Sequence, residues 1–275
     1  MEKTIIVLKI VLLSILIVFL TEILVSSINR DFNFDFNFDF NSKSTLIYDK
    51  NIKEDFNKID VYSKNLDLKF IKSNDDNINV KVYDKKDNNV TVNVENNTLK
   101  VVSNDKDACL FCFVQKREIV ITLPEKIYDL VVESRSGDIT SELDFNKVTL
   151  KSTSGDVKFN NVKDADIRVT SGDVDINKVD SLKTSLISGD LTVDSINKYV
   201  DIESTSGDID INNLELTMNS SINATSGDVS IYKGSNNIYY DTSVLSGYVD
   251  INNNNRHADV ELKINTKSGD ITIEN

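Results

Sequence analysis

Ser154-Gly155-Asp156-Val157-Lys158-Phe159 is the stretch that decides the fold, because close copies of it recur through the second half of the chain. Seven copies read Ser-Gly-Asp and one reads Ser246-Gly247-Tyr248. Subtracting successive glycine numbers gives intervals of 18, 17, 17, 18, 20, 20 and 22 residues. A period near 20 residues predicts stacked units that are each too small to bury a core alone. The eight motif glycines, out of nine in the chain, are Gly137, Gly155, Gly172, Gly189, Gly207, Gly227, Gly247 and Gly269.

The residues around each glycine alternate in polarity. The second residue after it is apolar in all eight copies and the fourth in seven, with polar residues between them. This period of two predicts a strand with one face in the core. The fifth and third residues before the glycine, and the motif serine, are expected to point inward. At the glycine the alternation of inward and outward residues shifts by one position, which predicts a corner of the chain at each of the eight glycines. With no helical periodicity, residues 131–275 read as an all-β solenoid.

The first 30 residues are expected to form a short cytoplasmic tail and a transmembrane anchor. Residues 5–28 are mostly apolar and about long enough to cross a bilayer. Lys3 and Lys9 flank the start of this run, which places the N-terminus in the cytoplasm and the remaining chain outside it. The alternative is a signal peptide cleaved near Val25-Ser26-Ser27. The predicted localisation is the cell membrane, with a single pass and an extracytoplasmic C-terminal domain.

Residues 31–45 form a linker, and in its first part, residues 31–41, aromatic and polar residues alternate strictly, which favours a strand with all its rings on one face. Such a strand could pack on or cap the neighbouring β domain, contact the membrane interface, or self-associate. Residues 46–130 also alternate, without the glycine motif, and are either a separate antiparallel domain or irregular first coils. A continuous all-β body is favoured. The rings of the linker are Phe32, Phe34, Phe36, Phe38 and Phe40.

The net charge of -13, with five arginines, argues against nucleic acid and against adsorption to anionic lipid as partners. The motif aspartates would stand about 5 Å apart on adjacent coils, and each pair would repel by about 0.8 kcal/mol even in water. The favoured interpretation is that each carboxylate accepts backbone N–H groups in its own corner. The alternative is a row of Ca²⁺ sites, the one cofactor considered. The aspartates are Asp138, Asp156, Asp173, Asp190, Asp208, Asp228 and Asp270.

No set of residues indicates catalysis. Cys109 and Cys112 form a lone CxxC with strand-like flanks, which favours a local disulfide or two inert thiols over redox chemistry. His257 reads as an exposed loop residue. Pairs of acids, Asp173 with Asp175 and Asp208 with Asp210, could imitate half of a polysaccharide lyase groove, but the short coils leave little room for one. The expectation is a non-enzymatic protein, with a glycan-active enzyme as a remote alternative.

The run Ile119-Val-Ile-Thr-Leu-Pro124, followed by the repeated Thr-Ser-Gly-Asp-Val/Ile, resembles the bacterial "putative adhesin" family, a domain of unknown function on membrane-anchored envelope proteins. The resemblance covers residues 58–275. It implies a right-handed β-solenoid displayed outside the cell and carries no established catalytic residues. Some members are encoded beside envelope-stress regulators, which suggests an alternative function as an accessory that binds a membrane partner.

The leading hypothesis is an adhesin-like solenoid that presents a repetitive binding face to cell-wall glycan or to an envelope protein. An open sheet edge is also predicted at the last coil, near Ile273, unless another chain or the preceding domain covers it, and a second copy could associate there. The face is expected in the outward column before each motif serine: Thr153, Thr170, Ile187, Thr205, Thr225 and Leu245.

Overall fold

The computed structural model describes residues 45–85, 89–104 and 117–274, and this part of the chain contains strands and turns but no helix. By its contacts the chain divides into Met1–Phe40 and Asn41–Asn275, and every described strand lies in the second unit. The first ten strands are β1 (Thr45–Ile52), β2 (Lys58–Asn65), β3 (Asp67–Lys72), β4 (Ile78–Asp84), β5 (Asn89–Glu95), β6 (Thr98–Asn104), β7 (Glu118–Leu123), β8 (Tyr128–Ser136), β9 (Ile139–Ser141) and β10 (Phe145–Ser154). The others are β11 (Val157–Ser171), β12 (Val174–Ser188), β13 (Leu191–Ser206), β14 (Ile209–Leu214), β15 (Ser220–Ser226), β16 (Val229–Ile231), β17 (Ile238–Ser246), β18 (Val249–Ile251), β19 (Val260–Ser268) and β20 (Ile271–Ile273).

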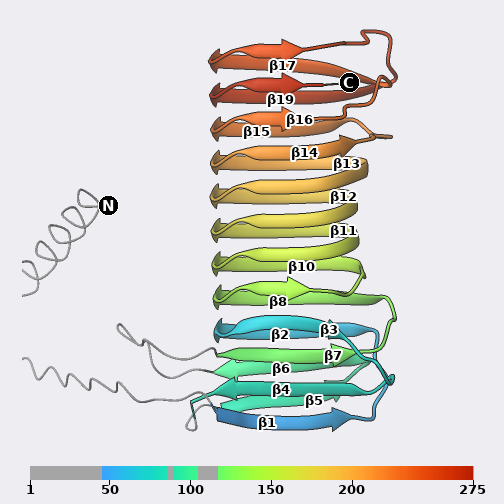
Figure 1. Ribbon diagram of the computed structural model, residues 1–275, viewed down its shortest axis with the longest axis vertical. Coiled ribbons are helices and arrows are strands. Elements are labelled where there is room, and N and C mark those ends of the chain that lie inside the picture. Colours follow the sequence, from blue (N-terminus) through green and yellow to red (C-terminus); the bar gives the residue numbers. More distant parts are fainter. Residues whose placement is uncertain (1–44, 86–88, 105–116, 275) are drawn as a thin grey trace, which may run out of the picture. The chain divides into compact units, whose positions relative to one another are not determined.

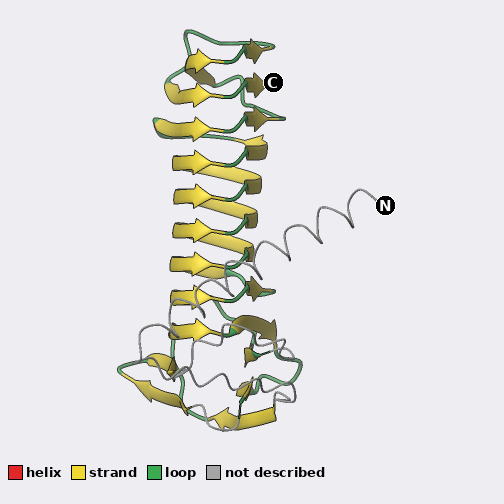
Figure 2. Ribbon diagram, turned by 90° about the vertical axis from the view of Figure 1, so that its left-hand side faces the viewer, coloured by secondary structure: helices red, strands yellow, loops and turns green. Residues whose placement is uncertain are grey.

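The strands of Asn41–Asn275 stack into a ladder of coils (Figure 1). From β8 to β20 each coil pairs in parallel with its neighbours, and β12 lies between β11 on one side and β13 on the other. β11, β12 and β13 each begin after one motif glycine and end before the next. Each therefore turns from one face of the stack to another, as Figure 2 shows. The all-β, solenoid-like architecture predicted from the repeat is confirmed.

The core is a continuous column of side chains along the stack. The residues five and three before each glycine are buried in most coils, as are those two and four after it, as expected from the alternation. The motif serine is different: Ser154, Ser171 and Ser188 are exposed. The prediction of an inward serine is therefore wrong, because the change of parity comes one residue earlier than expected. Two outward residues precede each glycine.

The glycines form the predicted corners. All eight have a positive φ, which L side chains rarely adopt. They also stack directly: a Cβ on Gly189 would lie 2.1 Å from the carbonyl oxygen of Gly172 in the coil below. A side chain at this position would overlap backbone atoms of the neighbouring coil, so both conformation and space require glycine.

The order of the coils in space departs from their order in sequence at the C-terminal end. β19 lies between β15 and β17, and β20 lies between β16 and β18. The last coil in sequence is therefore the second to last in space, and the outermost coil is β17–β18, as Figure 1 shows. The prediction of an open edge beside Ile273 is wrong, since β20 is paired on both sides.

The opposite end shows a similar exchange. β2 lies between β6 and β8, and β3 lies between β7 and β9. Beyond them, β4 pairs with β1 and β7, and β5 pairs with β6, all antiparallel. The antiparallel strands end the regular parallel stack.

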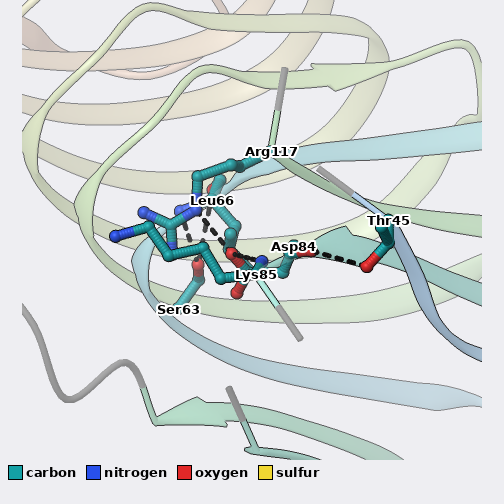
Figure 3. A network of polar contacts seen from close by, with 6 residues as sticks. All are labelled: Thr45, Ser63, Leu66, Asp84, Lys85 and Arg117. Atoms are coloured by element: carbon teal, nitrogen blue, oxygen red, sulfur yellow. Dashed lines mark hydrogen bonds and ion pairs between the residues drawn. The ribbon is translucent and has the colours of Figure 1, made fainter. Parts of the chain in front are cut away.

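A buried ion pair lies at this end (Figure 3). Nε of Arg117 is 2.5 Å from Oδ1 of Asp84, whose side chain is fully buried, and the same oxygen accepts the N–H of Lys85 at 2.7 Å. Close by, Oγ of Ser63 bonds both the N–H and the carbonyl of Leu66 at 3.3 Å. Removing one partner of such a pair would leave a buried charge uncompensated.

Candidate functional site

The motif aspartates form a ladder of hydrogen bonds along one edge of the stack. Oδ1 of Asp156 accepts the backbone N–H of Asp173 at 3.0 Å, and Oδ1 of Asp173 accepts that of Asp190 at 2.9 Å. The same bond recurs at every step, including the last, from Tyr248 N–H to Asp270 at 2.8 Å. The carboxylates thus accept N–H groups, as expected, but from the next coil rather than from their own corner. The ladder holds adjacent corners in register and offsets the repulsion between neighbouring charges.

The ladder has one member that the sequence reading missed. Oδ1 of Asp67 accepts the N–H of Asp138 at 3.0 Å, and the N–H of Asp67 is bonded to the carbonyl of Arg117. The corner at Asn65-Leu66-Asp67 has no glycine, so it does not match the repeat motif. The Asp67-Leu68-Lys69-Phe70 pattern that follows was the available signal. Burial raises the pKa of Asp67 above that of a free aspartate.

The spatial order also changes the neighbours within the ladder. Asp270 follows Asp228, although 42 residues separate them, and Tyr248 follows Asp270. The one degenerate motif therefore stands in the outermost coil. An aspartate there would have no further coil to supply an N–H group within the described chain. The substitution of tyrosine at this position is explained by its place in space rather than in sequence.

The seven aspartates proposed as weak Ca²⁺ candidates are all exposed. Within residues 45–85, 89–104 and 117–274, no three or more His, Cys, Asp or Glu side chains come close enough together to hold a metal ion. Each ladder carboxylate already uses one oxygen as a backbone acceptor. A Ca²⁺ ion takes six or more oxygens, which this geometry does not gather from one carboxylate per coil.

The expected binding column lies on the surface. Thr153, Thr170, Ile187, Thr205 and Thr225 are exposed on successive coils, and each is followed by an exposed serine. Leu245 is also exposed, at 84%, but it is not the next residue of this column in space. The coil that carries Lys267 lies between Thr225 and Leu245, so the continuous column has five members.

The remaining sequence candidates do not come together. Asp175 is 3.2 Å from Lys158, and Asp210 accepts a bond from the Tyr232 hydroxyl at 3.2 Å. His257 is exposed, and its backbone N–H is bonded to Oδ1 of Asn255. Cys109, Cys112, the linker phenylalanines and residues 5–28 lie outside the described residues. In the described part of the chain, no helix is both long and apolar enough to cross a membrane.

The stacked coils, the glycine corners and the polar ladder define a β-solenoid repeat domain. The chain belongs to the Toastrack DUF4097 family, whose model matches residues 56–274. No protein with a curated description matches the chain in sequence.

Solved structures of bacterial proteins share the fold. A putative adhesin from Bacteroides fragilis is 17% identical with a TM-score of 0.53, and the match covers 82% of this chain and 96% of that one. A putative adhesin from Parabacteroides distasonis is 16% identical with a TM-score of 0.52, covering 85% and 98%. At these identities the likeness concerns the fold.

Proposed function

We propose that this protein is a non-enzymatic, adhesin-like component of the cell envelope that binds a repetitive ligand through its exposed hydroxyl column. The observation that carries the proposal is the column Thr153, Thr170, Ile187, Thr205 and Thr225, which recurs once per coil beside exposed motif serines. Neighbouring members are separated by the strand spacing of about 4.8 Å. A rigid row in which four threonine hydroxyls accompany the apolar Ile187 suits a regular polymer such as cell-wall glycan. The two solved structures compared above are each described as a putative adhesin, which agrees with this class of function.

The binding test uses Asn41–Asn275, because this unit contains every described strand and the whole described core. We expect the purified unit to sediment with insoluble cell-wall glycan. Replacing Thr170 and Thr205 with Glu should reduce binding at least about tenfold, since two charges would interrupt the column. The matched control introduces the same two Glu residues at Thr140 and Thr192, which are half-exposed threonines on the strands after the corner. This control should bind as the wild type does. Equal loss in both variants would contradict the proposal.

We further propose that residues 5–28 anchor the chain in the membrane with the solenoid outside the cytoplasm. The support is the length of the apolar run and the lysines at its start. The full chain should fractionate with membranes, and protease added to intact cells should remove the solenoid. A chain that starts at residue 41 should leave the membrane fraction.

The alternative function is an accessory role in stress sensing. It would be favoured if the full chain bound glycan no better than it bound a partner protein extracted from the membrane.

A further inference from the structure

The outermost coil is packed less tightly than the coil beneath it. Val249 is 44% exposed, whereas Ile271, its register partner in the inner coil, is fully buried. Ile251 is half-buried, whereas its register partner Ile273 is only 1% exposed. The same contrast holds for Thr242 and Val244, which are half-buried above buried Ile264 and Thr266. Low burial of apolar residues is typical of segments that open locally.

A clamp closes the base of this loosely packed segment. The side-chain amide of Asn254 accepts the backbone N–H of Tyr240 at 3.0 Å and donates to the carbonyl of Tyr240 at 2.8 Å. Tyr240 and Ile238 are buried, at 1% and 0% exposure. The clamp thus ties together the two ends of residues 241–253, which we call the flap, and leaves the buried start of β17 outside it.

The flap covers the outer edge of the β19–β20 coil, but this coil does not need the flap to stay in place. β19 and β20 are paired with β15 and β16 on their other side, so those ladders stay intact when the flap leaves. The donors of the edge beneath the flap include the N–H groups of Gly269 and Ile271, which bond to the carbonyls of Ser246 and Tyr248. It also carries the Oδ1 acceptor of Asp270.

The edge selects its occupant. A Cβ at position 247 would lie 2.2 Å from the carbonyl oxygen of Gly269, so only glycine fits there. The residue after that glycine must donate its N–H to Asp270. The next two inward positions must be apolar to cover Ile271 and Ile273. These requirements describe an extended strand with glycine followed by alternating apolar residues, which is the pattern of the flap itself.

We propose that the flap opens as a unit about the Tyr240–Asn254 clamp and uncovers residues 263–273 as a binding edge for an extended polypeptide strand of this pattern. Such addition of a strand to a sheet edge gives affinity through main-chain bonds and specificity through side-chain pockets. This interaction surface is separate from the hydroxyl column and does not depend on it.

Amide hydrogen exchange by NMR tests the opening on Asn41–Asn275. The N–H groups of Gly269 and Ile271 donate to the flap, whereas those of Asp270 and Glu274 donate to Asp228 and Ile231 of the β15–β16 coil on the other side. We expect protection factors for Gly269, Ile271 and the flap amides to be at least about tenfold lower than those for Asp270 and Glu274. Uniform protection along this segment would overturn the proposal, because it would mean that the flap opens only with the coil beneath it.

Strand binding is tested with a fluorescent peptide of residues 241–253 and with the variant Tyr248→Pro, which removes the flap's N–H donor to Asp270. The peptide should bind this variant saturably, and a peptide carrying Gly247→Ala should bind at least about tenfold more weakly. Equal binding of both peptides would overturn the proposal that residues 263–273 bind a strand. The absence of binding, while the amides of Asp270 and Glu274 stay protected from exchange, would overturn it too. Asn254→Ala, which loosens the clamp and leaves the edge unaltered, is the second variant if Tyr248→Pro does not fold.

Discussion

At each corner, the missing side chain of glycine allows two coils to approach within backbone contact. Gly189 has a φ of 126°, and its added Cβ would meet the carbonyl of Gly172 at 2.1 Å. We expect Gly189→Ala to destabilise the solenoid by about 3 kcal/mol in urea unfolding, since both strain and overlap oppose it. Gly247→Ala has the same contact but lies in the flap, which can open to relieve it. A cost of about 1 kcal/mol or less is expected there. Equal costs would contradict this account.

The ladder aspartates act as acceptors, so an amide should replace the carboxylate. Oδ1 of Asp190 accepts the N–H of Asp208 at 2.8 Å. Asp190→Asn keeps this oxygen and removes repulsion from neighbouring carboxylates, so unfolding free energy should be unchanged or slightly higher. Asp190→Ala loses the acceptor and should cost about 1 kcal/mol. Chemical denaturation of the two variants measures the difference. A greater loss for Asn than for Ala would mean that the charge, rather than the hydrogen bond, matters.

Asp67 carries a pH dependence whose direction follows from its burial. Burial raises its pKa in the folded state, so the folded protein holds this proton more tightly than the unfolded chain does. Its contribution to stability is therefore most favourable below the unfolded pKa and falls as pH rises through the folded pKa. Asp67→Asn keeps the acceptor for Asp138 and does not titrate. The variant should gain stability relative to wild type as pH rises from about 3 to 7, which urea unfolding at each pH would measure. A constant difference would contradict the assignment.

At the scale of the elements, the alternation around the motif predicted the strands and most of the core. It did so because residues such as Val157 and Phe159 face the same side of one strand and meet their counterparts in every coil. The motif serine was misplaced for a local reason. A corner can move the parity change by one residue without altering the spacing that the sequence displays.

The stacking order could not be read from the repeat. All coils present similar columns, so the period does not say which coil lies on which, and the insertion of β19–β20 beneath β17–β18 leaves it unchanged. The hint was Tyr248, the one motif residue that cannot accept the next N–H group. The corner at Leu66 was missed because it lacks glycine. Side-chain hydrogen bonds from Ser63 stabilise this corner instead, and the motif does not include them.

The ladder as a whole makes a prediction for Ca²⁺. Each carboxylate has one oxygen engaged with the next coil, and the described residues do not gather three acidic, His or Cys side chains at one point. We expect isothermal titration of Asn41–Asn275 with Ca²⁺ to give no saturable heat at millimolar concentration, and chelator to leave the melting temperature unchanged. Saturable binding with a raised melting temperature would instead make the ladder a functional site.

On the scale of the whole solenoid, stability should be nearly a sum over coils and their interfaces, because each coil contacts only its neighbours. The central coils have similar registers: β12 pairs with β11 without a shift and with β13 through one register shift between Val179 and Ser181. The spatial ends are different, with antiparallel strands at one and the flap at the other. Changes of length should therefore be tolerated in the middle and not at the ends.

Deleting residues 172–188 tests this view directly. The deletion removes one full period and joins Ser171 to Gly189, so the motif and the inward columns are preserved. We expect the shortened unit to fold into a rod about 4.8 Å shorter by small-angle scattering, with unchanged strand content by circular dichroism. The control deletes residues 174–188, which removes Val174 and places Gly189 directly after Asp173, so that a second Gly-Asp pair interrupts the strand after the corner. It should fail to fold. If both deletions behaved alike, the coils would not be equivalent modules, and stability would depend on contacts that extend beyond neighbouring coils.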